Sequence, residues 1–166
     1  MKKLLLLRHA KSSWDDPAFS DFERPLNARG LITAAFMGEL IARRKLEVDA
    51  IISSPASRAA QTAMLVKENG GLNASLIFDE RIYEASPQTL LVVVSGLGDD
   101  LDSAMLVGHN PGIESFIGLL TATVEPMPTA ALALIEINIQ SWGDIKFGTG
   151  TLIEVIRPKE MMTAEL

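Results

Sequence analysis

The two histidines of the chain both follow apolar runs that are typical of buried β-strands. His9 comes after the run 3–7 and Arg8, and His109 comes after the run 103–108. Ligands of open α/β sheets bind beyond the carboxyl ends of the strands. Histidine changes its charge near neutral pH, so two histidines at this edge predict catalysis there. One histidine alone would be better explained as a core or loop residue, but a matching pair beside an arginine is not.

Two polar–proline pairs and a second arginine extend this pattern. In Ser54-Pro55 and Asn110-Pro111 a capping residue precedes a proline, which predicts that a helix begins at each pair. Arg58 would then lie in the first turn of one of these helices. Helix N-termini and arginine side chains both bind phosphate oxygens. We therefore expect a phosphate-binding site with a histidine on either side, and we assign Asn110 to substrate binding with them.

The charge of this site favours phosphoryl transfer without a metal ion or another cofactor. The chain has neither the glycine-rich loop of nucleotide-binding proteins nor a His-x-x-x-His pair for a metal. A zinc site built from His9, His109 and a carboxylate such as Asp15 or Glu84 is the alternative, but the two arginines would repel a dication. Phosphoryl transfer needs cations around the phosphate oxygens and a nucleophile in line with the leaving group. A neutral histidine can be that nucleophile, and nearby arginines favour the neutral form by lowering its pKa.

Composition limits the class of protein. At 166 residues, 48% of them apolar and 22% charged, the chain predicts one globular domain over residues 1–166. It has no cysteine, which excludes disulfides, thiolate metal sites and a cysteine nucleophile. A net charge of −6 argues against nucleic acid or an anionic membrane surface as a partner. The N-terminal apolar run ends at Arg8, too early for a secretory signal, and no run is long enough to span a membrane, so we expect a cytoplasmic protein.

Strand-like and helix-like segments alternate along the chain, with a polar loop at 11–26. The predicted strands cover residues 3–7, 49–53, 75–78, 103–108, 130–139 and 149–156. The predicted helices cover residues 28–44, 55–69, 88–95 and 111–121, and Asn27 caps the first of them. The last two strands predict an antiparallel hairpin joined by a turn at 142–144. This order predicts a three-layer α/β/α fold with a mostly parallel central sheet and an antiparallel C-terminal strand.

Three motifs together resemble the histidine phosphatase superfamily, whose members have a phosphoglycerate-mutase-like fold. The motifs are Leu7-Arg8-His9-Ala10, Ser54-Pro55-Ala56-Ser57-Arg58-Ala59-Ala60-Gln61-Thr62-Ala63 and Gly108-His109-Asn110-Pro111-Gly112. Arg24-Pro25-Leu26, Gly30 and the lack of an inserted cap between strands add to the likeness, which covers residues 2–157. Within the superfamily the chain is most similar to the small phosphohistidine phosphatases of the SixA type.

The resemblance implies a role for four of the residues already singled out. His9 is the expected nucleophile and would carry the phosphoryl group transiently. Arg8, Arg58 and His109 would line the phosphate pocket and neutralise charge in the transition state. The signature glycine is Ala10 in this chain, which predicts that this position does not need a positive φ.

The general acid is the least determined part of the expected site. Many members of the superfamily use a carboxyl group to protonate an oxygen leaving group, and Glu84 is the best-placed match, with a solvated loop carboxylate as the alternative explanation. Asp15, Asp16 and water are further candidates. Where many relatives have an asparagine this chain has Trp14-Asp15-Asp16, so an asparagine contact to phosphate cannot be carried over.

Three classes of function stay open at this point. The favoured one is removal of phosphate from phosphohistidine in proteins, with inorganic phosphate as the product, in signal transduction or in metabolism. The second is a small-molecule phosphomonoesterase or mutase of the same superfamily. The third is a non-catalytic phosphate-binding module, against which the intact Arg8, His9, Arg58 and His109 argue. We expect a monomer.

Overall fold

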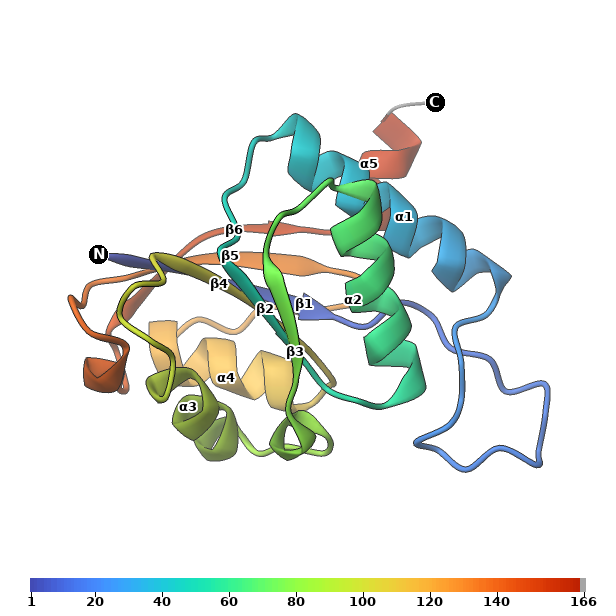
Figure 1. Ribbon diagram of the computed structural model, residues 1–166, viewed down its shortest axis with the longest axis horizontal. Coiled ribbons are helices and arrows are strands. Elements are labelled where there is room, and N and C mark those ends of the chain that lie inside the picture. The colour runs from blue at the N-terminus through green and yellow to red at the C-terminus, as the bar shows by residue number, and fades with distance from the viewer. Residues whose placement is uncertain (165–166) are drawn as a thin grey trace.

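The computed structural model describes residues 1–164 and is built around one six-stranded sheet of order β3-β2-β4-β1-β5-β6 (Figure 1). The strands are β1 (Lys2–Arg8), β2 (Ala50–Ser53), β3 (Ser75–Phe78), β4 (Ser103–Gly108), β5 (Leu132–Ile137) and β6 (Gly150–Ile156). Strands β3, β2, β4 and β1 are parallel, whereas β5 pairs antiparallel with both β1 and β6. The predicted mostly parallel sheet with an antiparallel C-terminal strand is confirmed.

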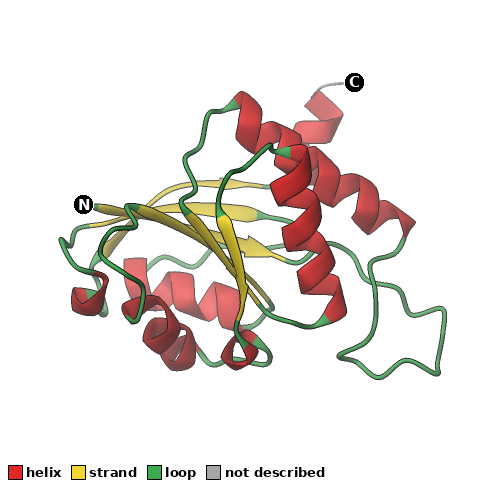
Figure 2. Cartoon of the chain, viewed as in Figure 1, coloured by secondary structure: helices red, strands yellow, loops and turns green. Residues whose placement is uncertain are grey.

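Helices cover both faces of this sheet, which gives the predicted three layers (Figure 2). One face carries α1 (Ala28–Arg43), α2 (Ser57–Asn69) and α5 (Pro158–Ala164), and the other carries α3 (Pro87–Ser95) and α4 (Gly112–Thr121). Short 3-10 turns lie at Glu80–Ile82 and Trp142–Asp144. No helix among residues 1–164 is long and apolar enough to cross a bilayer.

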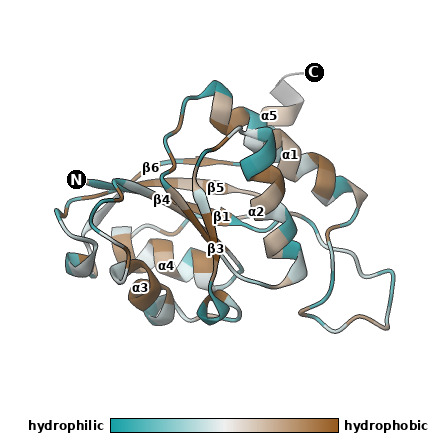
Figure 3. Ribbon diagram, in the orientation of Figure 1, coloured by the Kyte–Doolittle hydropathy of each residue, from teal (hydrophilic) through white to brown (hydrophobic). Residues whose placement is uncertain are grey.

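The central strand β1 is buried on both faces because each of its four leucines packs into one of two hydrophobic clusters. Leu4 and Leu6 belong to the cluster under α3 and α4, and Leu5 and Leu7 belong to the cluster under α1 and α2. Successive strand residues point to opposite faces, so a continuous apolar run is what a strand covered by two helical layers requires. The hydropathy colouring shows the same apolar character in the middle of the sheet (Figure 3).

The start of α1 is fixed against the segment that leaves β1. Asn27 caps the helix as predicted, because its side chain accepts a hydrogen bond of 2.8 Å from the backbone N–H of Gly30. A Cβ at Gly30 would lie only 2.1 Å from the backbone oxygen of Lys11, so this close approach requires glycine. The chain just after His9 is therefore packed directly on the first turn of α1.

The predicted starts of two other helices are wrong. Helix α2 begins at Ser57 with Ala56 at the N-cap position, so Ser54 does not cap it. Helix α4 begins at Gly112 with Pro111 at the N-cap position, so Pro111 is not a first helical residue. In both places the polar residue keeps a local bond, from the N–H of Ala56 to Ser54 and from the N–H of Glu114 to Asn110, and also makes the tertiary contacts described below. Helix α5 and the 3-10 turn at Glu80–Ile82 were not predicted, whereas the turn predicted at 142–144 is present as a 3-10 turn.

The carboxyl ends of β1, β2 and β4 meet at one edge of the sheet. Arg8 is in register with Gly108, and Ser53 is in register with Val107 on the other side of β4. The residues that follow neighbouring parallel strands in register lie side by side. His9, Ser54 and His109, which follow β1, β2 and β4, are therefore neighbours at this edge. The long segment that follows His9 contains one isolated bridge, Ser12–Leu26, and otherwise no strand or helix before α1 (Figure 1).

Candidate active site

The two histidines come together at this edge, as the sequence predicted. Their ring centroids are 5.1 Å apart, and the residues are only 7% and 8% exposed. The backbone N–H of His9 donates to the carbonyl of Gly108 at 3.0 Å, which joins the ends of the two strands that carry them. The relative placement of the two imidazoles is therefore fixed by the sheet.

Hydrogen bonds assign the protonated nitrogen of each imidazole. Nδ1 of His9 lies 2.7 Å from the carbonyl oxygen of Ala10, which can only accept, so Nδ1 carries the proton and Nε2 keeps a free lone pair. Nε2 of His109 lies 2.8 Å from the hydroxyl of Ser54, which already accepts from the N–H of Ala56. If Ser54 donates its hydrogen to Nε2, then Nδ1 of His109 carries the proton. The pair thus presents one lone pair and one N–H.

Both imidazoles are neutral at neutral pH. Burial, together with the charges of Arg58, Arg8 and Arg24, lowers the pKa of His9 to about 4, against the opposing hydrogen bond to Ala10. Burial and the proximity of His9 and Arg58 lower the pKa of His109 to about 3. Desolvation and neighbouring positive charge both disfavour an imidazolium, so the two causes act in the same direction.

Three buried donors around the histidines have no hydrogen-bond partner. Among the described residues, the buried side-chain nitrogen and oxygen atoms without a partner are Nε of Arg8, Nε of Arg58 and Nδ1 of His109. Buried polar groups are almost always paired, because leaving one unpaired costs about 1–3 kcal/mol. Two guanidinium groups and an imidazole N–H with unused donors at one edge of the sheet suit an anion with several oxygens, such as a phosphoryl group.

Asp21 holds Arg58 in place, and sequence reasoning missed it. Its carboxylate accepts hydrogen bonds from the hydroxyl of Tyr83 at 2.6 Å, from Arg24 at 3.0 Å and from Arg58 at 3.1 Å. Its backbone oxygen accepts a further bond of 2.7 Å from Arg58. The partners Arg58 and Tyr83 lie 37 and 62 residues away in the sequence, so no local pattern could have revealed them.

The same contacts show that Asp21 is ionised. The hydrogen bonds from Tyr83 and Arg24 and the charge of Arg58 hold the pKa of the Asp21 carboxyl well below its usual range. The bond to Asp21 also raises the pKa of Tyr83 to about 12, so that hydroxyl stays protonated. Asp21 is therefore a fixed negative charge and cannot deliver a proton near neutral pH.

Arg24 and Trp14 border the same site. The guanidinium carbon of Arg24 lies 3.5 Å from the ring centroid of Trp14, and its Nη1 donates to the hydroxyl of Ser12 at 2.7 Å. Arg24 is only 8% exposed although it lies in the irregular segment after β1. Its contacts with Asp21 and Trp14 give this segment a defined path beside the histidines.

Asn110 is occupied by contacts within the protein. Its amide nitrogen donates to Glu114 at 2.9 Å and to the carbonyl oxygen of Met127 at 3.0 Å. The same Met127 oxygen accepts a bond of 3.0 Å from Nη1 of Arg8, and Glu114 also accepts from the N–H of Met127. Asn110 and Glu114 thus fix the loop on which Arg8 rests, a link that is not visible in the sequence.

The candidate acids all lie on the surface. Glu84 is exposed and has a positive φ of 53°, directly after Tyr83, whose ring lies 5.5 Å from that of His109. Asp15 and Asp16 are exposed in the segment after β1, where their contacts are local to that segment. Glu84 is therefore the candidate that follows a residue in contact with the histidine pair. Ala10 is fully buried and does not have a positive φ, as expected.

The chain itself uses one of the first amides of α2 and one of α4. The N–H of Ser57 at the start of α2 donates to the carbonyl of Phe22, and the N–H of Ile113 in α4 donates to the carbonyl of His109. The contribution of the two helix N-termini to phosphate binding stays a prediction. No group of three or more histidine and carboxylate side chains among residues 1–164 is placed to hold a metal ion.

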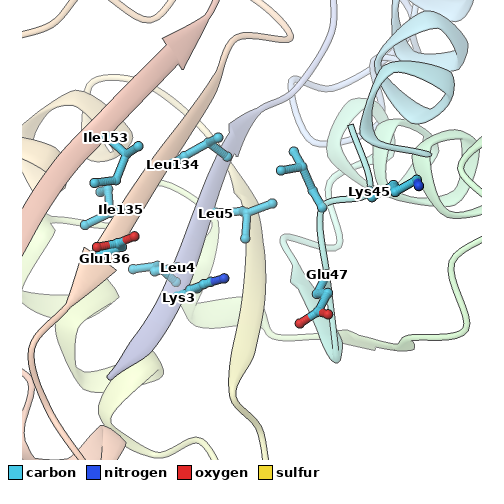
Figure 4. A pocket seen from close by; sticks show the side chains of 10 residues that line it. Lys3, Leu4, Leu5, Lys45, Glu47, Leu134, Ile135, Glu136 and Ile153 are labelled. Carbon is cyan, nitrogen blue, oxygen red and sulfur yellow. The ribbon is translucent and has the colours of Figure 1, made fainter. Parts of the chain in front are cut away.

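A crevice of about 250 Å³ lies at the other end of the sheet and has a different character (Figure 4). It lies over the amino end of β1, with Leu5 and Leu134 as apolar lining and Lys3, Glu47 and Glu136 among its charged residues. Opposite charges alternate around it, and it contains neither a histidine nor an unpaired buried donor. The chemistry of the chain is therefore concentrated at the carboxyl edge.

Comparison with known proteins decides the family. The family model of the histidine phosphatase superfamily (branch 1) matches residues 4–89, which contain Arg8, His9 and Arg58. An uncharacterized protein of Mycobacterium tuberculosis is 30% identical over 89% of this chain and 96% of its own. The chain belongs to the histidine phosphatase superfamily.

Solved structures of the histidine phosphatase superfamily share the whole fold. A protein of Agrobacterium tumefaciens assigned as a phosphohistidine phosphatase SixA has a TM-score of 0.81 and 29% identity, and the match covers 95% of this chain and 98% of that one. A SixA structure with bound tungstate has a TM-score of 0.83 over 96% of this chain, and its 21% identity shows the fold alone. The sequence-based identification of the superfamily is confirmed.

The low pKa values of this histidine phosphatase give a first prediction. The chain has only two histidines, so an NMR titration of its imidazole carbons follows both without overlap. Because a pKa of about 4 for His9 and about 3 for His109 leaves each ring neutral above that pH, neither should titrate as the pH falls from about 8 to about 5. The neutral form should be lost only as the pH falls through the folded-state values. A midpoint near 6.5 for either ring would show that burial and the arginines do not control its charge.

Proposed function

We propose that the protein is a metal-independent phosphohistidine phosphatase that works through a covalent phosphohistidine intermediate on His9. The observation that carries the proposal is the set of three unpartnered buried donors, from Arg8, Arg58 and His109, around a neutral imidazole. The donors provide a binding site for phosphoryl oxygens, and the lone pair on Nε2 of His9 provides the nucleophile. In this proposal these four residues are catalytic, whereas Asn110 and Asp21 are positioning residues.

In the first step Nε2 of His9 attacks phosphorus as the bond to the leaving nitrogen of the substrate breaks. The proton stays on Nδ1 of His9, which donates a hydrogen bond to the carbonyl oxygen of Ala10, and this bond stabilises the positive charge that develops on the ring. Arg8, Arg58 and the N–H of His109 neutralise the charge on the phosphoryl oxygens. In the second step water attacks the phosphorus, the bond to His9 breaks, and inorganic phosphate is released with His9 neutral again.

The acidity of the leaving group supports a phosphorus–nitrogen bond as the target. An imidazole leaves readily because its conjugate acid has a pKa of about 6.5, whereas an alkoxide must be protonated as it leaves. Asp21, the carboxylate that is bonded to Arg58, is held ionised, and the other candidate acids are exposed. A site without a buried acid fits a substrate that leaves unaided.

The relatives support the same class and keep one alternative open. The structure assigned as SixA from Agrobacterium tumefaciens is 29% identical over 95% of this chain. Phosphoglycerate mutase 1 of Saccharomyces cerevisiae is 36% identical, but over 50% of this chain. A small-molecule phosphomonoesterase or mutase is therefore the second candidate, and the observation that favours it is Glu84, which follows Tyr83 at the site and could serve as an acid. A non-catalytic module would not need an ordered nucleophile such as His9.

A rate comparison on two substrates tests the proposal. We expect the protein to dephosphorylate a histidine-phosphorylated protein much faster than a sugar phosphate or another alkyl phosphate, and to do so in excess chelator. Faster turnover of the monoesters would favour the second candidate. Loss of activity in chelator that zinc or magnesium restores would contradict metal independence.

The substitution Glu84→Gln separates the two substrate classes. If Glu84 protonates an oxygen leaving group, the substitution should slow monoester hydrolysis by roughly 10²–10⁴, the usual contribution of general acid catalysis. The same substitution should have little effect on phosphohistidine hydrolysis, because the imidazole needs no acid. Glu80→Gln is the matched control, since Glu80 is an exposed carboxylate of the same loop. Unchanged monoester hydrolysis in Glu84→Gln would make Glu84 a solvated loop residue.

A further inference from the structure

A second concave surface, lined in part by Lys11 and Pro128, is rich in cations. This groove has a volume of about 710 Å³, and the residues that characterise it are Lys11, Arg29, Ile32, Pro128, Lys159 and Met162. It lies between the first turns of α1, the segment before β5 and helix α5, which packs against α1. A volume of this size exceeds what one phosphoryl group needs and falls in the range of pockets that hold larger ligands.

The groove is continuous with the backbone that holds the nucleophile. On one side Lys11 comes two residues after His9, and its carbonyl accepts from the N–H of Asn27 at 3.0 Å. On the other side Pro128 follows Met127, the residue whose carbonyl oxygen binds Arg8 at 3.0 Å. Ala130, two residues after Pro128, also donates its N–H to the carbonyl of His9 at 3.0 Å, so both walls start from segments that are bonded to the catalytic pair or follow it in the chain.

Among the described residues, every ionisable side chain that lines the groove is positive, although the whole chain has a net charge of −6. Lys11, Arg29 and Lys159 are exposed on this surface. Arg29 lies in the first turn of α1, where the helix dipole favours acidic side chains instead. Local helix energetics therefore do not account for Arg29, whereas an anionic ligand does.

An apolar surface lies among the cations. Ile32 is 63% exposed, and Pro128 and Met162 line the same groove. Partly exposed apolar side chains surrounded by polar ones are typical of protein contact sites. The combination fits an extended segment with several carboxylates and at least one apolar anchor better than it fits a bare inorganic anion.

We propose that this groove binds an acidic segment of the phosphoprotein substrate, next to the phosphohistidine that reaches His9. The proposal rests on the phosphohistidine phosphatase function proposed above and identifies its partner by charge. Long-range attraction between the cations and an acidic partner would also speed encounter, which an acidic enzyme body otherwise disfavours.

Kinetics with two phosphohistidine peptides test this assignment. One peptide has Asp, Glu and one Leu beside the phosphohistidine, and the other has Ser and Gly at the same positions. In the double variant Arg29→Glu/Lys159→Glu we expect KM for the acidic peptide to rise about tenfold with kcat unchanged, and KM for the neutral peptide to stay within about twofold. Both substitutions place an acid at a helix N-terminus, so folding should be retained.

The matched control is Lys146→Glu, a charge reversal at an exposed lysine of the loop before β6, which is not part of the groove. It should leave KM for both peptides unchanged. Equal KM values for the two peptides in the unmodified protein, or an equal rise in Lys146→Glu and the double variant, would overturn the assignment. A rise in KM for phosphoramidate, which is too small to reach the groove, would show that the double variant damages the phosphate pocket instead.

A binding measurement separates failure of this assignment from failure of the proposed function. Fluorescein-labelled, unphosphorylated forms of both peptides are titrated with the protein at low salt and followed by anisotropy. The acidic form should bind more tightly than the neutral form, and the double variant should abolish the difference. If the acidic peptide binds more tightly in this way but neither phosphopeptide is hydrolysed, the proposed function is wrong, whereas the assignment of the groove to an acidic segment is supported. If a small organic phosphate competes with the acidic peptide and is hydrolysed faster, the groove belongs to a small-molecule site and the assignment fails.

Discussion

The substitution His9→Ala should abolish turnover while leaving the phosphate pocket able to bind. We expect kcat to fall by at least about 10⁴-fold on a phosphohistidine substrate, because no other side chain presents a free imidazole lone pair in the site. We do not expect His109 to replace it, since Nε2 of His109 is hydrogen-bonded to Ser54 at 2.8 Å. Calorimetry with tungstate should still detect binding, because Arg8, Arg58 and His109 keep their unused donors.

The covalent intermediate gives this prediction a direct readout. Rapid quenching in alkaline denaturant, where phosphohistidine survives, should reveal a phosphoryl group on His9 by mass spectrometry in the unmodified protein. The variant His109→Ala should still form this adduct, although more slowly and with weaker tungstate binding. Full activity in His9→Ala, or a phosphoryl group found only at His109, would contradict the mechanism.

Arg58→Ala should reduce activity on both substrate classes by roughly 10²–10³, measured as kcat/KM. The phosphoryl group and the charge that develops on it are the same in a phosphohistidine and in a monoester, so the loss should not depend on the leaving group. This behaviour differs from that of Glu84→Gln, which should affect monoesters alone. Steady-state kinetics on both substrates, run in parallel, make the comparison.

Two further variants separate charge from geometry at this position. Arg58→Lys keeps the positive charge but loses the fork that binds both the phosphoryl group and Asp21, so we expect an intermediate activity. Arg81→Ala removes an arginine that is paired with Asp79 on the surface, and it should leave both activities unchanged. A loss in Arg58→Ala that is confined to monoesters would place Arg58 at the leaving group instead of the phosphoryl group.

The position of the two histidines at one edge of the sheet could be predicted from the sequence, because each follows an apolar run that is typical of a buried strand. The apolar runs before His9 and His109 are buried on both faces, and such runs are read directly from composition. Once β1 and β4 are parallel neighbours, the residues that follow them must lie together, and the register of Arg8 with Gly108 confirms this. The pairing of the histidines and the placement of both arginines needed no further information.

The remaining parts of the site depend on contacts between distant segments. The pattern of a capping residue before a proline predicted that Ser54 caps a helix. Its hydroxyl is instead bonded to His109, 55 residues further along the chain. In the sequence, Asp21 is one of several polar residues of a loop, and nothing distinguishes it from its neighbours. Its bonds to Arg58 and Tyr83 form only when three segments fold together. Such hydrogen bonds leave no periodic pattern, so propensity and spacing cannot anticipate them.

The position of β1 in the sheet has a consequence for how the protein opens. Amides of β1 are locked between β4 and β5, so they should exchange with solvent deuterium only through global unfolding. Amides of the segment 11–26 have one bridge and a few bonds that stay within the segment, such as those from Phe19 to Asp16 and from Glu23 to Ser20, and they should exchange far sooner. His9, the proposed nucleophile, is thus attached to the strand whose amides should exchange most slowly. Asp21, which is bonded to Arg58, lies in a segment whose amides should exchange among the fastest. Thermal fluctuations below the melting temperature should therefore release Arg58 long before they displace His9.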